Sequence, residues 1–83
     1  MLAVRFMNLD NGPFREMRAE VFATDREALA AVEAHAASAG FSSVRKVQDD
    51  EPWHVRYTAR TPGGRAGRNI AFADYVPDDE AAP

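Results

Sequence analysis

Polar and apolar positions alternate along most of this chain, except in a central segment that follows a helical period. Residues 1–9 and 14–23 alternate with period two, which is typical of strands. Between them, Asp10–Pro13 is a strong turn signal, and two alternating runs around an Asn-Gly pair predict a β-hairpin. Three more alternating runs follow the central segment, at residues 43–48, 53–61 and 69–76. The pattern predicts five strands in all.

The central segment, Thr24–Phe41, has the signature of a capped helix. Thr24 and Glu27 have the spacing of a capping box, and Gly40 can adopt the left-handed conformation that ends a helix. A stripe of mostly small apolar side chains lies between these caps at helical spacing: Ala28, Leu29, Val32, Ala36 and Ala39. Because the stripe has little bulk, we expect the helix to lie close to a sheet that supplies the large side chains.

The predicted element order is ββαβββ, an α+β fold in which a single helix packs on one face of a mainly antiparallel sheet. If the helix returns the chain beside the first strand, the strand order 2-1-3-4-5 makes all neighbours antiparallel. We expect one face to carry the apolar core and the other to carry charged residues. The expected core side chains are Val4, Phe6, Met17, Val21, Trp53, Val55 and Tyr57. The expected solvent-facing ones are Arg5, Glu16, Arg18, Glu20, His54, Arg56 and Arg60.

The helix, the Gly40-Phe41 pair and the two strands that follow resemble the split βαβ unit of ferredoxin-like domains. The same half of the chain also resembles small bacterial regulators that inhibit ribonucleases. The resemblance rests on apolar spacing, so it implies a partly ferredoxin-like fold and carries no site residue to this sequence.

Length and composition predict one soluble domain over residues 1–76, followed by an acidic, disordered tail at residues 77–83. The absence of cysteine excludes a disulfide framework and fits a reducing cytoplasm, which is the expected location. No long apolar run predicts a membrane span, and the N-terminus is too polar for a signal peptide. A net charge of −3 argues weakly against a general nucleic-acid coat.

Catalytic and metal-binding motifs are weak throughout. His35 sits at the edge of the helix stripe with no convergent partner, which indicates a boundary histidine. Asp49–Glu51 lacks the spaced oxygen ligands of a calcium loop, and Ser42–Ser43 has no predictable base. The Gly63–Gly67 loop lacks the Gly-Lys-Ser/Thr of a phosphate-binding loop. The sequence therefore predicts neither an enzyme nor a cofactor or metal site.

One asymmetry in charge remains. Residues 53–73 contain no acidic side chain, whereas four arginines fall there. Arg56 and Arg60, with His54, lie on one face of the predicted strand, and Arg65 and Arg68 lie on the following loop. They could bind phosphates or an acidic protein surface. They could equally be solubilising charges that pair with Glu16, Glu20 or the acidic tail.

These observations favour a small non-enzymatic regulator that binds and inhibits or adapts a larger protein, such as a nucleic-acid-processing complex. A phage-type inhibitor such as an anti-CRISPR protein, or a nuclease regulator, would fit this size. The expected partner-binding residues are Arg56, Arg60, Arg65, Arg68 and His54. The alternative is a module that binds nucleic acid directly through its sheet and its arginine-rich hairpin. No membrane partner is expected, and the sequence leaves the oligomeric state open.

Overall fold

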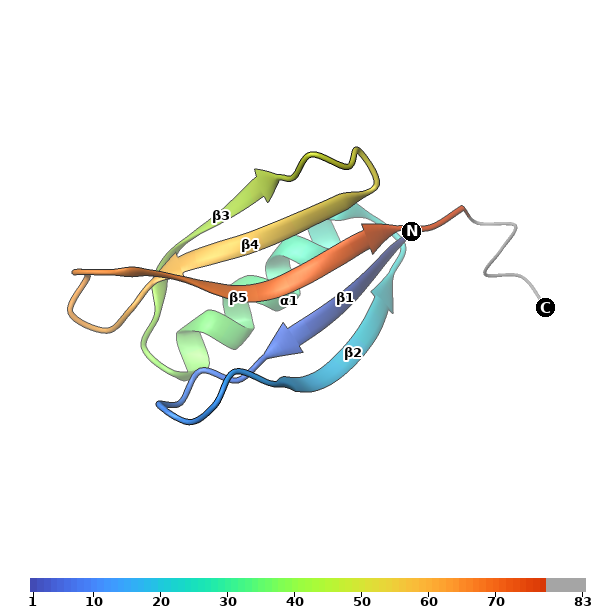
Figure 1. Ribbon diagram of the computed structural model, residues 1–83. Helices are drawn as coiled ribbons and strands as arrows, with labels where there is room; N and C mark the ends of the chain where they lie inside the picture. The colour runs from blue at the N-terminus through green and yellow to red at the C-terminus, as the bar shows by residue number, and fades with distance from the viewer. Residues whose placement is uncertain (78–83) are drawn as a thin grey trace.

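The computed structural model describes residues 1–77 as one helix packed on one face of a five-stranded sheet (Figure 1). The elements, in chain order, are β1 (Leu2–Met7), β2 (Glu16–Phe22), α1 (Asp25–Ser38), β3 (Ser42–Gln48), β4 (His54–Arg60) and β5 (Gly67–Tyr75). The predicted ββαβββ order and α+β class are confirmed. The acidic tail predicted at 77–83 falls, beyond its first residue, outside the described residues.

Strand order in the sheet is β2-β1-β5-β4-β3, with all neighbours antiparallel. The predicted order 2-1-3-4-5 is wrong, because α1 carries the chain to the far edge and β5 returns to the centre. Composition explains this choice. Ile70, Ala71 and Ala73 of β5 are fully buried, whereas five of the seven β3 side chains are exposed. A strand whose side chains are mostly polar suits the edge of a sheet, whereas a strand with several buried apolar side chains suits the centre.

Both predicted helix ends are present. The amide of Glu27 donates to Thr24 Oγ1 at 3.2 Å, which satisfies one free donor of the first turn. At the other end the amide of Phe41 donates to the Ala36 carbonyl at 2.9 Å, and that of Gly40 to the Ala37 carbonyl at 3.1 Å. This pair of bonds is a Schellman motif, and Gly40 has the positive φ of 80° that it requires.

The core forms where α1 meets the sheet. Of the predicted stripe, Ala28, Val32 and Ala36 are buried and Leu29 is partly buried, whereas Ala39 is exposed. The sheet supplies the large side chains, and those that are fully or almost fully buried include Leu2, Val4, Phe6, Val55, Tyr57 and Ile70. Small helix residues therefore allow close packing against bulky strand residues, as the sequence indicated.

Three expected core residues are exposed instead: Met17 by 59%, Val21 by 52% and Trp53 by 52%. Val21 lies opposite Ala3, so it shares the face of the sheet that points away from α1. A register shift at the start of β2 interrupts its alternation near Met17, and Trp53 lies in the turn before β4.

The prediction for the polar side of β2 is also wrong. Arg18 lies opposite Phe6 on the face covered by α1, with its guanidinium 4.0 Å from the centre of the Phe6 ring. Its Nη1 atom donates to Glu20 Oε1 at 2.7 Å. Both side chains remain half-exposed, because β2 is an edge strand.

Candidate functional site

The face of the sheet opposite α1 has no covering element among residues 1–77, and we call it the open face (Figure 1). Its central residues follow from strand register. Arg5 lies opposite Phe72, Phe72 lies opposite Arg56, and Asp74 lies opposite His54. These five side chains come from three neighbouring strands, β1, β5 and β4. The open face is the candidate functional site.

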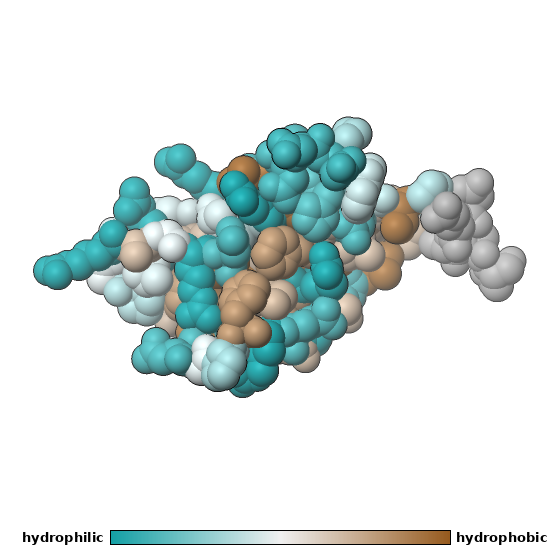
Figure 2. Space-filling model, viewed as in Figure 1, coloured by the Kyte–Doolittle hydropathy of each residue, from teal (hydrophilic) through white to brown (hydrophobic). Residues whose placement is uncertain are grey.

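Four rings form a continuous line across this face, and we call it the aromatic row: Phe14, Phe72, His54 and Trp53. The Phe14 ring meets the Phe72 ring edge-to-face at 6.3 Å, and the His54 ring stacks on Phe72 at 6.1 Å. Trp53 meets His54 edge-to-face at 5.8 Å. Figure 2 shows an apolar patch near the middle of this view, surrounded by hydrophilic residues. Phe14 is 53% exposed and Trp53 is 52% exposed, so both ends of the row can contact a partner.

Two carboxylates hold His54 in the aromatic row. Its Nδ1 lies 2.5 Å from Asp74 Oδ1, and its Nε2 lies 3.3 Å from Asp49 Oδ2. The other oxygen of Asp49 lies 3.7 Å from Arg56 Nε. Asp49 follows β3 and Asp74 ends β5, so these contacts tie the β3–β4 turn to the centre of the sheet. Asp49 is partly buried against these two partners, so it is not a simple solvated turn residue.

The five predicted partner-binding residues are not all brought together. His54, Arg56 and Arg60 lie on the open face, since they alternate with the buried residues of β4. Arg65 is exposed on the adjoining β4–β5 loop, and Arg60 Nη1 bonds the Gly64 carbonyl of that loop at 3.1 Å. The suggested pairing of these arginines with Glu16 and Glu20 is absent from the ion pairs of residues 1–77.

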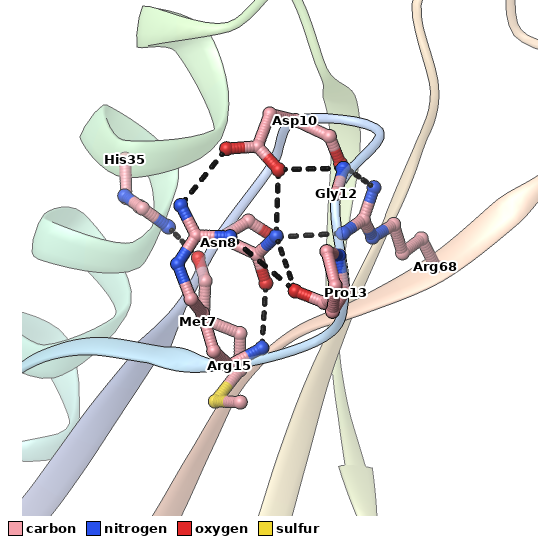
Figure 3. Close-up of polar contacts among 8 residues, drawn as sticks. All are labelled: Met7, Asn8, Asp10, Gly12, Pro13, Arg15, His35 and Arg68. Atoms are coloured by element: carbon pink, nitrogen blue, oxygen red, sulfur yellow. Dashed lines mark hydrogen bonds and ion pairs between the residues drawn. The ribbon is translucent and has the colours of Figure 1, made fainter.

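Arg68 points elsewhere. It lies opposite Ala59, on the helix side of the sheet, and its guanidinium reaches the β1–β2 loop (Figure 3). Nη1 donates to the Asp10 carbonyl and Nη2 to the Asn8 carbonyl, each at 2.9 Å. Two charge-assisted hydrogen bonds to main-chain oxygens make Arg68 an anchor for that loop.

The loop that Arg68 holds is organised around Asn8, which is fully buried. Its side chain donates to Asp10 Oδ1 and to the Pro13 carbonyl, and its Oδ1 accepts from the amide of Arg15 at 2.8 Å (Figure 3). Hydrogen bonds from Asn8, the Gly12 amide and Arg15 lower the pKa of Asp10 from 3.8 to about 2. This network fixes the loop that carries Phe14 to the open face.

Two other residues of the open face were not recognised as candidates from the sequence. Phe72 and Arg45 lie on it through register, opposite Arg56 and Thr58 respectively. The alternation of Phe72 with Ala71 and Ala73 is a usable signal, because small buried residues next to a large one indicate the side that faces the core. Arg5 was placed on this face by its alternation, but only the register shows its guanidinium 5.8 Å from the Phe72 ring centre.

Charge is distributed unevenly between the two sides of the molecule. The open face carries four arginines against two partly exposed aspartates: Arg5, Arg45, Arg56 and Arg60 against Asp49 and Asp74. The exposed surface of α1 carries Asp25, Glu27 and Glu33 against Arg26. The open face is therefore basic, whereas the exposed surface of α1 is acidic.

A second polar cluster, Asp25, Lys46 and Tyr75, ties the start of α1 to β3 and β5. Lys46 Nζ lies 2.5 Å from Tyr75 Oη and 3.0 Å from Asp25 Oδ2, and Tyr75 Oη donates to Asp25 at 2.9 Å. The hydrogen bond with Tyr75, followed by that with Asp25, raises the pKa of Lys46 to about 12. The hydrogen bond with Lys46 lowers the pKa of Asp25. A lysine held this firmly in its charged form is unsuited to act as a base or nucleophile.

His35 contacts the sheet through its side chain. Its Nε2 lies 2.7 Å from the Met7 carbonyl, and its ring meets Phe6 edge-to-face at 5.3 Å. Because a carbonyl oxygen can only accept, Nε2 donates this bond. Within residues 1–77 there is no group of three or more His, Asp or Glu side chains arranged to bind a metal ion.

Comparisons of the chain with protein-family models, curated proteins and solved structures give no match. No helix among the described residues is both long and apolar enough to cross a membrane.

Proposed function

We propose that this protein is a small non-enzymatic regulator that binds a larger protein through its open face and thereby inhibits or adapts it. The observation that carries the proposal is the aromatic row, which ends in the half-exposed side chains of Phe14 and Trp53 and lies among arginines. Exposed aromatic and arginine side chains are the types that contribute most to protein–protein binding. A nucleic-acid-processing complex is the proposed partner.

The chemistry of the face defines the partner surface. A basic surface with apolar rings at its centre complements an acidic surface with apolar pockets, and charge complementarity speeds association. Neighbouring strands and the Asp49–His54–Asp74 contacts hold the central rings in place. Little ordering entropy is then lost on binding, which favours affinity. A regulator that blocks a functional surface of its partner needs no catalytic residues of its own.

A second candidate is direct binding of single-stranded nucleic acid. The observation that favours it is the presence of exposed rings and arginines on one sheet, since bases stack on aromatic side chains while arginines contact phosphates. Four contacts count against it. His54 and Arg5 lie against the Phe72 ring, and Asp49 and Asp74 place negative charge beside the row.

Titration of labelled single-stranded and duplex oligonucleotides at low and moderate salt separates the two candidates. Direct nucleic-acid binding predicts tight binding that weakens by about one power of salt concentration per phosphate contact. The regulator predicts no salt-sensitive binding of either form. Tight binding that is lost in Phe14→Ser/Trp53→Ser would overturn the protein-directed proposal.

Partner capture then tests the regulator directly. We expect a protein that is retained by the wild type and by the helix-side control Arg26→Ser, and lost by Phe14→Ser/Trp53→Ser. Arg56→Ser/Arg60→Ser should slow association with that protein and reduce its dependence on salt, because rim charges attract an acidic partner. Capture that is equal for all variants would exclude the open face as the binding site.

A further inference from the structure

The two edges of the sheet differ in how they meet solvent. An edge strand presents unpaired main-chain donors and acceptors, which other strands can pair with unless the edge is interrupted or charged. β3 is interrupted by a register shift between Ser42 and Arg45, with Ser43 at a left-handed φ of 55°. It also carries adjacent cations at Arg45 and Lys46. β3 is therefore protected against pairing with another copy of itself.

β2 is less protected, because its own register shift lies near its start, beside Met17, and the rest of the strand is uninterrupted. It pairs regularly with β1 from Arg18 to Phe22, and its six residues from Glu16 to Val21 are exposed. No strand within residues 1–77 pairs with its outer edge. Val21, 52% exposed, adds apolar surface beside Ala19 and Ala3 on the open face. A shallow hollow of about 250 Å³ lies over these small side chains.

Charge along β2 selects one antiparallel register for pairing between two copies. A two-fold axis perpendicular to the sheet lies midway between one residue and the same residue of the other copy. Registers centred on Arg18, Ala19 or Glu20 pair most of the strand. Centring on Arg18 or Glu20 sets that charge against its own copy, which is unfavourable. Centring on Ala19 sets Arg18 of each copy opposite Glu20 of the other and places the axis at the midpoint of the strand.

We propose that β2 pairs with β2 of a second copy of this chain in this register, with Ala19 on the two-fold axis. The two five-stranded sheets then form one continuous sheet, with both helices on the same side. Arg18 and Glu20 already lie 2.7 Å apart within one copy. Pairing therefore creates a closed group of two arginines and two glutamates of alternating sign. The two open faces join into a single surface that carries the aromatic row twice.

Sedimentation equilibrium from about 10 µM to about 1 mM tests the dimer, because so short an interface is smaller than those of stable complexes. We expect a monomer–dimer equilibrium in this range. Glu20→Arg should weaken dimerisation about tenfold or more, since two attractive pairs become repulsive. The exchange Arg18→Glu/Glu20→Arg should restore it, and Arg45→Glu on β3 should leave it unchanged. A wild type that stays monomeric throughout would overturn the proposal.

Cysteine substitution provides a test that does not depend on the charges, because the natural sequence contains no cysteine. In the proposed register the two Ala19 Cα atoms lie about 5 Å apart, which suits a disulfide. The two Val21 positions are offset by four residues, about 13 Å along the strands. Ala19→Cys should therefore form a covalent dimer on mild oxidation, and Val21→Cys should not. Cross-linking of Val21→Cys alone would show that the register is wrong.

Discussion

Arg68 and Asn8 are 60 residues apart in the sequence, yet Arg68 Nη2 donates to the Asn8 carbonyl at 2.9 Å. The contact joins β5 to the loop between β1 and β2, on the opposite side of the sheet from the aromatic row. It places one member of the arginine-rich hairpin in a structural role, which separates Arg68 from Arg56, Arg60 and Arg65.

Arg68→Ser should lower the free energy of unfolding by about 1–3 kcal/mol, because two main-chain carbonyls lose a charged donor. The matched control is Arg65→Ser on the same hairpin, which should change it by less than about 0.5 kcal/mol. Urea unfolding of both variants measures the difference. Equal stabilities would show that Arg68 is not an anchor.

Val32→Asp should unfold the domain or come close to it. Val32 is fully buried between α1 and the sheet, so a carboxylate there has no partner. The cost of several kcal/mol is a large share of a total stability of about 5–15 kcal/mol. The exposed Ala34 on the same helix provides the control, and Ala34→Asp should retain a cooperative thermal melt. Similar melting of both variants would mean that the buried face of α1 is misplaced.

Tyr57→Phe should leave stability unchanged or raise it by up to about 1 kcal/mol. The Tyr57 hydroxyl is buried and has no hydrogen-bond partner among residues 1–77, and burial raises its pKa. Removal of an unpaired buried hydroxyl relieves its desolvation penalty. Tyr75→Phe is the contrasting variant, since its hydroxyl bonds both Lys46 and Asp25 and its loss should be destabilising. Denaturant midpoints compare the two, and a clear loss in Tyr57→Phe would contradict the assignment.

Asp10 should make stability depend on pH in strongly acidic solution. Its pKa is about 2 in the folded chain against an ordinary value of 3.8, so the folded state holds its proton less tightly. The resulting stabilisation is fully present above 3.8 and is lost as pH falls from there through about 2. The denaturant midpoint of Asp10→Asn should therefore lie below that of the wild type near neutral pH and converge with it over this window. A constant difference at all pH values would contradict this origin.

Part of the candidate site could be predicted from alternation alone. His54, Arg56 and Arg60 had to share a face of β4, because successive strand residues point to opposite sides. The partners that give this face its chemistry could not be predicted. Phe14 and Phe72 are 58 positions apart, and only the β1–β2 loop and the central position of β5 bring their rings together. The contacts of Arg68 could not be predicted for the same reason, since its carbonyl partners lie on a distant loop.

The sequence by itself determined the features that depend on neighbours within one turn or two strand positions. These are the helix with its Thr24 and Gly40 ends, the alanine stripe, the number of strands and the faces of β1 and β4. The tertiary structure decided which strand fills the centre, because β3 and β5 would both be antiparallel beside β1 and only burial distinguishes them. It also decided which way the β2 side chains point, since the register with β1 sets Val21 opposite Ala3 and Arg18 opposite Phe6. Long-range pairing sets both, and alternation within one segment carries no information about its neighbour.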